Sequence, residues 1–286
     1  MSSPGNMFLG DAVSSCVIAA VFGACVILAL RYVYYVAFYE RIRLFLRRRG
    51  QGYEMYTPLI AEESWEGLVS AAIVGLVSWA LLAGHNDNCH LTDTTACLRD
   101  WPQHRTAPWA LHALFLLLLA WHSHCTTKHW VGLGRVQGWD AVLHHAATLA
   151  LLGLSYTQGL LRIGLLAHWL FVVTNPLLSV SKLMHCLDAR LFVVSKKVAF
   201  GLFAACYFAT RVVLVPLVLL RVTLQELPRM PFDWRLAAVA NGGLLLLYGI
   251  SLFWFGRLLG ILFTGKLDAS PRLVMRGEAR RWQKKL

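Results

Sequence analysis

Residues 139–182 read WDAVLHHAATLALLGLSYTQGLLRIGLLAHWLFVVTNPLLSVSK. The stretch holds two apolar segments, 139–158 and 161–182, and each has the roughly 20 residues that a helix needs to cross a bilayer core. The two segments are joined by only a few residues, Thr157, Gln158 and Gly159. They therefore predict either a tight helical hairpin or a pair of helices that dips partly into the membrane.

The composition of the whole chain also favours a membrane protein. Of 286 residues, 57% are hydrophobic and 15% are charged, and the mean hydropathy is +0.55. Soluble domains carry about 25% charged residues, and a soluble protein this apolar could not cover its surface with polar groups. Disordered chains are poor in hydrophobic residues. The composition thus excludes both classes.

Five further stretches are long and apolar enough to span a bilayer. The seven predicted spans are 12–38, 66–84, 108–125, 139–158, 161–182, 194–220 and 236–264. The first is too long and starts too late for a simple signal peptide, and no small-residue cleavage site follows it, so we expect a retained span. The prediction is an all-α polytopic membrane protein with about seven transmembrane helices.

The basic residues indicate the orientation of these spans. The segments 39–53, 126–138, 182–197 and 265–286 hold 18 of the 27 Lys and Arg residues, whereas the alternate loops hold five. The positive-inside rule then places the N-terminus on the lumenal side and the C-terminus in the cytosol. The net charge of +12 therefore records topology, and we expect no nucleic-acid partner.

Ionisable residues inside spans are costly and mark candidate functional sites. Asp140 and His144 are four residues apart and share a helix face, a spacing at which a carboxylate can orient an imidazole for acid–base catalysis. His145 projects about 100° away from His144, so the two rings cannot both face lipid. The pattern indicates either a catalytic site or a polar pair that holds helices together.

The fifth predicted span carries further polar residues. His168 and Asn175 are seven residues apart on one face, and Pro176 should kink the helix by freeing the carbonyl of Val172. Arg162 lies near the non-cytosolic end of this span and can extend to the interface, whereas Arg211 lies deeper in the sixth span and needs a partner. These residues either line a cavity or belong to a kinked packing helix.

Two other groups of residues have the chemistry of a metal site and of a disulfide. His122, His124 and His129 lie near the cytosolic end of the third span, but their spacing and that of His144 and His145 do not fit a di-iron site, so no metal site is predicted. Cys89 and Cys97 form the other group and lie in the loop 85–107, on the non-cytosolic side. An oxidising compartment permits a disulfide between them, and the alternative is two free thiols.

The stretch 144–164, HHAATLALLGLSYTQGLLRIG, resembles the Lag1 motif of ceramide synthases within the TRAM–LAG1–CLN8 (TLC) domain. The residues of this stretch that match without a gap are His144, His145, Ala147, Thr148, Ser155, Tyr156, Arg162 and Gly164. Further matches are Trp101, Pro102, Pro108, Ser123, Lys182, Phe208, Ala209, Thr210, Arg211, Pro216, Asn241, Gly249, Phe253 and Trp254. The resemblance implies a TLC domain over about 61–264, after an N-terminal helix and basic loop (1–60) and before a basic tail (265–286).

The resemblance implies an enzyme of the endoplasmic reticulum that joins a fatty acyl-CoA to a sphingoid base, with no metal or tightly bound cofactor. His144 or His145 would act as general base and Asp140 would orient it. The lipid cavity would be lined by His168, Arg162, Asn175, Tyr156 and Arg211. The resemblance also leaves open a homo- or heterodimer.

One departure from the family pattern bears on this function. The positions of the family's next-helix run His-Asp-x-x-Asp are Phe171, Val172 and Asn175 here, and none of these side chains can act as acid, base or nucleophile. His168 lies one turn before Phe171 and could substitute. The alternative function is a non-catalytic TLC protein that binds lipid or regulates membrane composition or trafficking.

Overall fold

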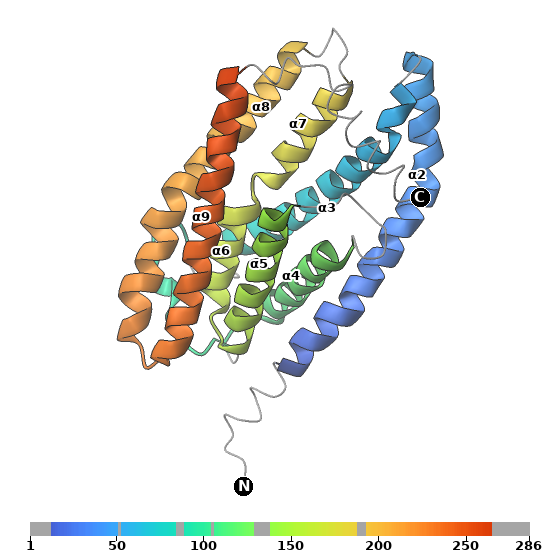
Figure 1. Cartoon of the computed structure of the whole chain (residues 1–286). Coiled ribbons are helices and arrows are strands. Elements are labelled where there is room, and N and C mark those ends of the chain that lie inside the picture. The colour runs from blue at the N-terminus through green and yellow to red at the C-terminus, as the bar shows by residue number, and fades with distance from the viewer. Residues whose placement is uncertain are drawn as a thin grey trace. The chain divides into compact units, whose positions relative to one another are not determined.

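The computed structural model describes residues 13–50, 53–83, 89–103, 106–128, 138–187 and 193–264. Within these ranges the regular structure is helical throughout, with no strand (Figure 1). The helices that are long and apolar enough to cross a membrane are Val13–Arg48, Tyr53–Leu82, Leu161–Cys186, Ser195–Arg229 and Trp234–Thr264. These findings confirm an all-α chain with several candidate membrane spans.

The other two predicted spans fall on shorter helices, α4 (Trp109–Thr127) and α5 (Trp139–Thr157), each of 19 residues. At about 1.5 Å per residue each is roughly 28 Å long, close to the ~30 Å thickness of a bilayer core. Both helices carry histidines near one end, which makes them less apolar than the five longer helices. The count of seven spans and the orientation of the termini stay predictions.

The described helices divide into two compact units. The first comprises Met1–Ala29, Ala72–Val173 and Ala209–Leu252, and the second comprises Leu30–Ala71, Thr174–Phe208 and Phe253–Leu286. The first unit contains the histidines of α4, α5 and α6 (Leu161–Val172). Each unit is described separately below.

A glycine turn joins α5 to α6 in the first unit. The Gly159 N–H donates to the Tyr156 carbonyl and the Leu160 N–H donates to the Ser155 carbonyl, which is the Schellman arrangement that ends many helices. This arrangement requires a left-handed residue, and Gly159 has a φ of 68°. The tight helical turn expected from the sequence is therefore confirmed, and α5 and α6 are neighbours in contact.

The close approach of α5 and α6 depends on Gly164. A Cβ atom at this position would lie 2.8 Å from Ser155 Cβ and 3.0 Å from Phe115 Cζ. We expect Gly164→Val to destabilise the protein by about 1–3 kcal/mol, because overpacking forces neighbouring groups apart. Unfolding of the detergent-purified protein measures this effect. Gly153→Val on α5 is the control, since a Cβ there meets nothing within 4 Å; equal effects of the two substitutions would contradict the packing argument.

A loop around residues 89–107 packs against this turn. Trp101 Nε1 donates to the Gln158 carbonyl at 2.7 Å, and the Gln103 N–H donates to the Gly159 carbonyl at 3.0 Å. The Gln103 side chain is fully buried and donates to the Cys97 carbonyl at 2.9 Å. Side-chain and backbone hydrogen bonds thus fix the loop on the α5–α6 turn.

Cys89 and Cys97 form a disulfide in this loop, which confirms one of the two alternatives. We expect mass spectrometry of the denatured, alkylated protein to find both cysteines unmodified before reduction. Reduction should then make both available, because a disulfide sulfur cannot react with the alkylating reagent. Alkylation of Cys89 and Cys97 without a reductant would contradict the pairing, and the free cysteines Cys16 and Cys25 provide the internal control.

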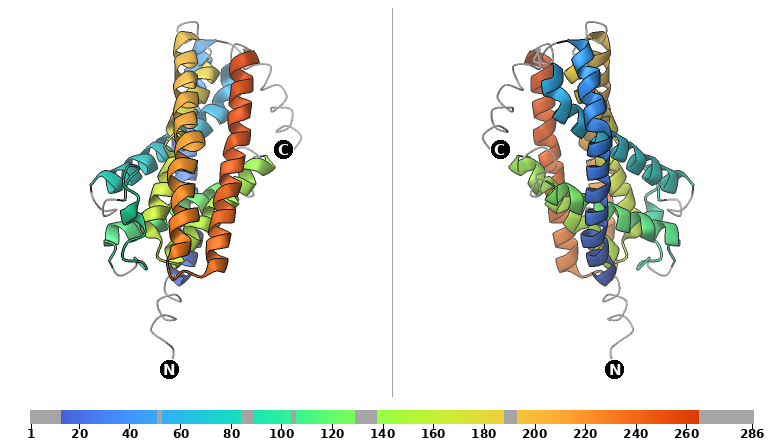
Figure 2. Two further views of the ribbon diagram at one scale, coloured as in Figure 1. Left: turned by 90° about the vertical axis from the view of Figure 1, so that its left-hand side faces the viewer. Right: turned by 90° about the vertical axis from the view of Figure 1, so that its right-hand side faces the viewer.

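The rest of the first unit comes from both ends of the chain. The π-helical segment η1 (Ala19–Gly23) packs on α4, where a Cβ at Gly23 would lie 2.5 Å from Ala120 Cβ. The π-helices η5 (Phe208–Leu220) and η6 (Val222–Glu226) run antiparallel to the first part of α9 (Trp234–Thr264) (Figure 2).

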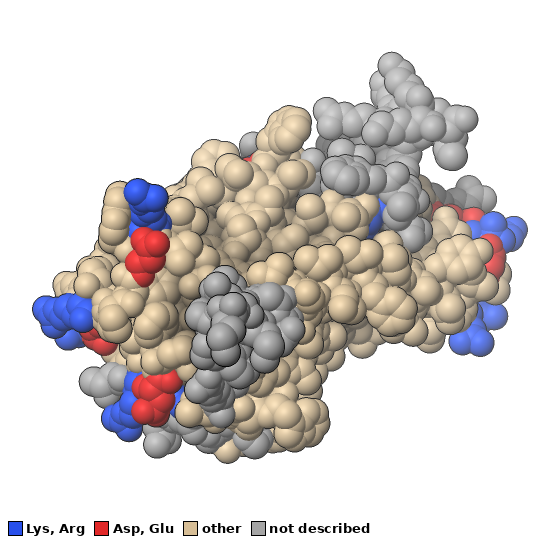
Figure 3. Space-filling view, turned by 90° about the horizontal axis from the view of Figure 1, so that it is seen from below, with Lys and Arg blue, Asp and Glu red and all other residues tan. Residues whose placement is uncertain are grey.

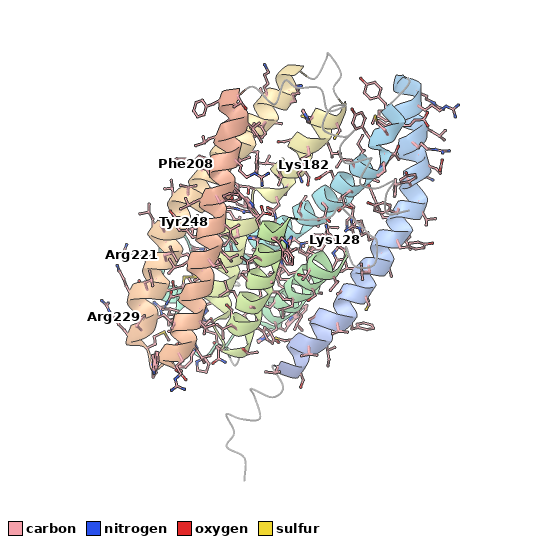
Figure 4. The ribbon with its side chains drawn as sticks, viewed as in Figure 1. Lys128, Lys182, Phe208, Arg221, Arg229 and Tyr248 are labelled. Carbon is pink, nitrogen blue, oxygen red and sulfur yellow. A yellow bond between two sulfur atoms is a disulfide. The ribbon has the colours of Figure 1, made fainter. Side chains whose placement is uncertain are left out.

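Two polar contacts join these helices inside the first unit. The Tyr248 hydroxyl donates to the Val212 carbonyl at 3.4 Å, and Asn241 Nδ2 donates to the Thr223 carbonyl at 3.1 Å. Arg221 and Arg229 are exposed and point away from the neighbouring helices (Figure 4). Contacts between a side chain and a freed backbone carbonyl are a common way to join apolar helices in a membrane.

The kink expected at Pro176 is present as a break in the helix. α6 ends at Val172 and α7 (Asn175–Leu187) begins at Asn175, so the chain leaves the α-helical pattern at Val173 and Thr174. Proline has no N–H to donate, and its ring clashes with the carbonyl four residues earlier. The interruption therefore lies just ahead of the proline.

The second unit is held by ion pairs between α2 (Ala24–Arg49) and α3 (Thr57–Leu82). Arg31 is fully buried and pairs with Glu62 and, at 3.1 Å, with Glu66. The Tyr35 hydroxyl donates to Glu62 at 2.8 Å. The other charges of α2 lie beyond Phe38, toward the end of the helix, so these contacts fix which faces of α2 and α3 meet.

A second ion pair connects α3 to α7, where Lys182 Nζ lies 2.9 Å from Glu63 Oε1.

Charged side chains are sparse on the face drawn in Figure 3, where uncharged residues predominate. Many large hydrophobic side chains are exposed, among them Leu82, Trp109, Trp139, Trp234 and Phe263. Such a surface is suited to contact with lipid.

Candidate active site

Four histidines meet in the first unit, from three helices. α4 contributes His122, α5 contributes His144 and His145, and α6 contributes His168. The ring centroids are 5.6 Å apart for His144 and His145, 6.0 Å for His145 and His122, and 5.2 Å for His122 and His168. We call these four residues the histidine cluster.

Helix geometry explains why two adjacent histidines can share one cluster. Neighbouring residues on α5 point about 100° apart, so two helices on different sides of α5 are needed to cover both rings. His144 is buried at 8% exposure and His145 is half-buried. α4 and α6 both contact α5 and each other, which brings His122 and His168 to the same region.

Arg211 adds a positive charge next to this cluster. It lies in η5, is buried, and donates a hydrogen bond to the Phe171 carbonyl, with its guanidinium 5.9 Å from the centre of the Phe171 ring. It is also close enough to His144 to interact with it electrostatically. The expectation that Arg211 needs a partner inside the membrane is met by the Phe171 backbone.

A narrow cavity lies beside the cluster and reaches between α5, α6, η5 and α9. Its volume is about 60 Å³, and its wall is mostly apolar. The polar residues of the wall are Thr148, Ser155, His168 and Thr223. The Thr148 hydroxyl donates to the His144 carbonyl at 2.8 Å. The cavity thus combines an apolar lining with one imidazole of the histidine cluster.

An open apolar groove follows the other side of α5. It has a volume of about 680 Å³ and lies between α5 and α9. Small residues leave this space, namely Ala146, Ala147, Ala150, Gly153 and Gly243. Leu143 also lines the groove and directly precedes His144, so the groove reaches the helix turn that carries the histidine pair.

The remaining predicted site residues lie at various distances from the cluster along these helices. Asp140 is in the first turn of α5, and its carboxylate lies close to Gly138. Tyr156 is buried, with its ring 5.7 Å from that of His112. Asn175 begins α7 and belongs to the second unit. The roles expected for these three residues stay predictions.

Arg162 contacts the loop around residues 89–107. Its guanidinium donates to the Arg99 carbonyl at 2.9 Å and to the Ala96 carbonyl at 3.3 Å, and lies 3.9 Å from the Asp100 carboxylate. Its backbone N–H donates to Gln103 Oε1 at 3.0 Å. These contacts fix the position of Arg162, and its expected role in binding substrate stays a prediction.

Among the described residues, no group of three or more His, Cys, Asp or Glu side chains has the geometry to hold a metal ion. His124 stacks on Trp121, with ring centroids 5.1 Å apart. His129 lies outside the described residues.

The sequence interpretation missed His122 as a neighbour of His145. A usable signal was present, because the predicted topology puts the end of the third span and the start of the fourth on the same side of the membrane. Histidines near those two ends therefore lie at a similar depth. The sequence alone does not show which face of α4 turns toward α5, because packing between the helices decides that.

Comparison with known proteins shows which family this chain resembles. The chain matches the TLC domain (TRAM–LAG1–CLN8) family over residues 61–260. Ceramide synthase 4 of Homo sapiens is 28% identical over 231 residues, which cover 78% of this chain and 54% of that protein. Ceramide synthase 4 of Bos taurus is 28% identical over 182 residues, covering 64% and 44%.

A third relative, ceramide synthase hyl-2 of Caenorhabditis elegans, is 25% identical over 154 residues, covering 51% of this chain and 44% of that protein. The chain spans about half the length of these curated relatives. The family match covers more than half of the chain and includes the whole histidine cluster. Together with the apolar helices, it identifies an integral membrane protein that belongs to the TLC domain family.

Proposed function

We propose that this protein is a ceramide-synthase-like N-acyltransferase, which transfers the acyl group of a fatty acyl-CoA to the amine of a sphingoid base. The observation that carries the proposal is the buried histidine cluster beside an apolar cavity, inside the TLC domain. The names of the three relatives support the same reaction class. Acid–base chemistry on a lipid needs such a combination of proton-transfer groups and apolar surface.

In this proposal His144 or His145 takes the proton from the amine as its nitrogen attacks the thioester carbon. The C–N bond forms, the C–S bond breaks, and the thiolate of CoA leaves and takes up a proton. Asp140 orients the histidine, and His168, which lines the cavity, contacts the lipid. Arg162, Tyr156 and Arg211 contribute to substrate binding from the same unit. The thioester is already activated, so the reaction calls for no metal and no bound cofactor.

The groove between α5 and α9 supports access of a lipid substrate from the bilayer. A hydrocarbon chain in this groove would contact Leu143 and the small residues of α5. Its polar end would then lie near His144, one residue along the helix. We place the protein in the endoplasmic reticulum, with a cytosolic C-terminus and as a homo- or heterodimer, as part of the same proposal.

One observation favours a second candidate function, a non-catalytic TLC protein that binds lipid. Phe171 and Val172, at two of the positions where the family resemblance implies the histidine and an acidic residue, are buried apolar side chains. A pocket without these groups could keep its lipid affinity and lose its chemistry. The histidine cluster opposes this reading, because lipid binding alone needs no buried imidazoles.

An acyl-transfer assay distinguishes the two functions. Microsomes from a host that lacks its own ceramide synthases, and that expresses this chain, would receive fatty acyl-CoA and labelled sphinganine. We expect labelled ceramide. No ceramide, under conditions in which a family enzyme produces it, would reject the enzyme and favour the lipid-binding protein.

A further inference from the structure

His122 and His168 form a buried pair that the proposed reaction does not yet use. Each residue is 4% exposed, and the two rings meet edge to face at a centroid distance of 5.2 Å. Both nitrogens of both rings have no hydrogen-bond partner in the described part of the chain. The pair joins α4 to α6 in the middle of the first unit.

Such a pair is an expensive way to join two helices. A buried polar atom without a hydrogen bond costs about 1–3 kcal/mol, whereas two apolar rings of similar size would pack at no such cost. In a membrane-spanning helix, a polar residue kept at that cost is a candidate functional residue. The ring nitrogens of His122 and His168 are thus available to a substrate, a water or another imidazole.

The ring contacts of the pair indicate which other histidine it acts on. His122 contacts His145 on one side, at 6.0 Å between centroids, and His168 on the other, at 5.2 Å. His145 in turn contacts His144 at 5.6 Å. The four imidazoles therefore form a continuous row of ring contacts, in which one water between neighbouring nitrogens would complete a hydrogen-bonded path.

A neutral imidazole has one N–H donor and one acceptor nitrogen, so it can take a proton on one side and release one on the other. The far end of the row, His168, lines the cavity together with Thr148 and Thr223. The row thus links the histidine pair on α5 to the interior of the cavity.

We infer that His122 and His168 are positioning residues that act through His145 and form a proton relay with it. The inference rests on the proposed acyl transfer. When the amine attacks the thioester, its proton passes to His145 and moves along the row through His122 to His168. The departing thiolate takes a proton back from the row, so that the four imidazoles end the cycle as they began it.

The relay predicts a specific kinetic effect for His122→Gln. The amide of glutamine can keep a hydrogen bond to a neighbouring ring, but it cannot exchange protons as imidazole does. We expect kcat for ceramide formation by the purified full chain in lipid nanodiscs to fall about 10- to 100-fold. This is less than the roughly 10²- to 10⁴-fold contribution of an acid–base group, because the general base itself stays in place. KM for the acyl-CoA and for sphinganine should stay within about twofold, since His122 itself lines neither the cavity nor the groove.

His124→Gln is the matched control, because His124 is equally buried on the same helix, two residues further on, and stacks on Trp121 outside the row. Its kcat should stay near that of the wild type. His122→Ala should regain activity when imidazole is added to the assay, which a purely structural role would not produce. This rescue also keeps the test valid if the substitution loosens the fold.

Two results would overturn the relay in an active protein. One is a wild-type kcat for His122→Gln, and the other is an equal fall in His122→Gln and His124→Gln with no imidazole rescue of His122→Ala. An inactive wild type would instead reject the proposed function and the relay together. The acyl-transfer activity of the wild type thus distinguishes a failure of the relay from a failure of the proposed function.

Discussion

Replacing His144 and His145 together by alanine is expected to reduce ceramide formation by about 10²- to 10⁴-fold, the range that a positioned general base contributes. Both residues lie in the histidine cluster. Either ring could accept the amine proton, so the double substitution is needed to remove the base. Initial rates at equal amounts of membrane protein measure the effect.

The control for this experiment is His185→Ala. His185 is a half-buried histidine on α7, in the second unit and outside the histidine cluster. Its activity should match the wild type. If the double variant kept a rate within about threefold of the wild type, a range too small for a lost general base, the assignment of the base to α5 would be wrong.

Replacing Arg31 by methionine is expected to lower the free energy of unfolding by about 3–5 kcal/mol, the cost of breaking a buried ion pair. The guanidinium is fully buried and pairs with Glu62 and Glu66, and the Tyr35 hydroxyl also binds Glu62. Without Arg31, these carboxylates would lose its positive charge in a low-dielectric environment. Unfolding of the detergent-purified protein by heat or denaturant measures the loss.

Two further variants test this explanation. Arg43→Met on the same helix removes a pair with Glu40 whose side chains are 47% and 59% exposed, and should change stability by less than about 1 kcal/mol. Adding Glu62→Gln to Arg31→Met should restore part of the lost stability, because it removes a buried negative charge that Arg31 neutralises in the wild type. A loss for Arg31→Met no larger than that for Arg43→Met would contradict a buried ion pair.

The sequence predicted the helical class and the family because both depend on local patterns. Apolar runs mark the helices, Gly159 permits the tight turn, and Pro176 requires an interruption. The span boundaries were less accurate. The first span was expected to end at 38, but the helix continues to Arg48, because arginine stops the apolar run without breaking a helix.

The second span shows the same limit at its start. It was expected from 66, yet the helical segment begins at Tyr53 and includes Glu62 and Glu63. These carboxylates lower the local hydropathy, and their neutralisation by Arg31 and Lys182 depends on contacts with other helices. Periodicity shows which residues share a face but does not show which helix covers it.

The candidate site was predicted in part for the same reason. The motif of α5 identified His144 and His145, and the polar residue in α6 identified His168. Their link through His122 depends on how α4 packs against both helices, and no local pattern encodes that. Likewise, Gln103 was not expected to join the loop around residues 89–107 to α6.

The most direct test of the account is a product measurement with the purified wild-type chain alone in nanodiscs of defined lipid composition. The bilayer would contain sphinganine, and fatty acyl-CoA would be added from outside. The account predicts ceramide and free CoA in equal amounts, increasing linearly with time and with the amount of protein. Binding of both lipids with no ceramide formed, or CoA release without ceramide, would contradict acyl transfer on this chain.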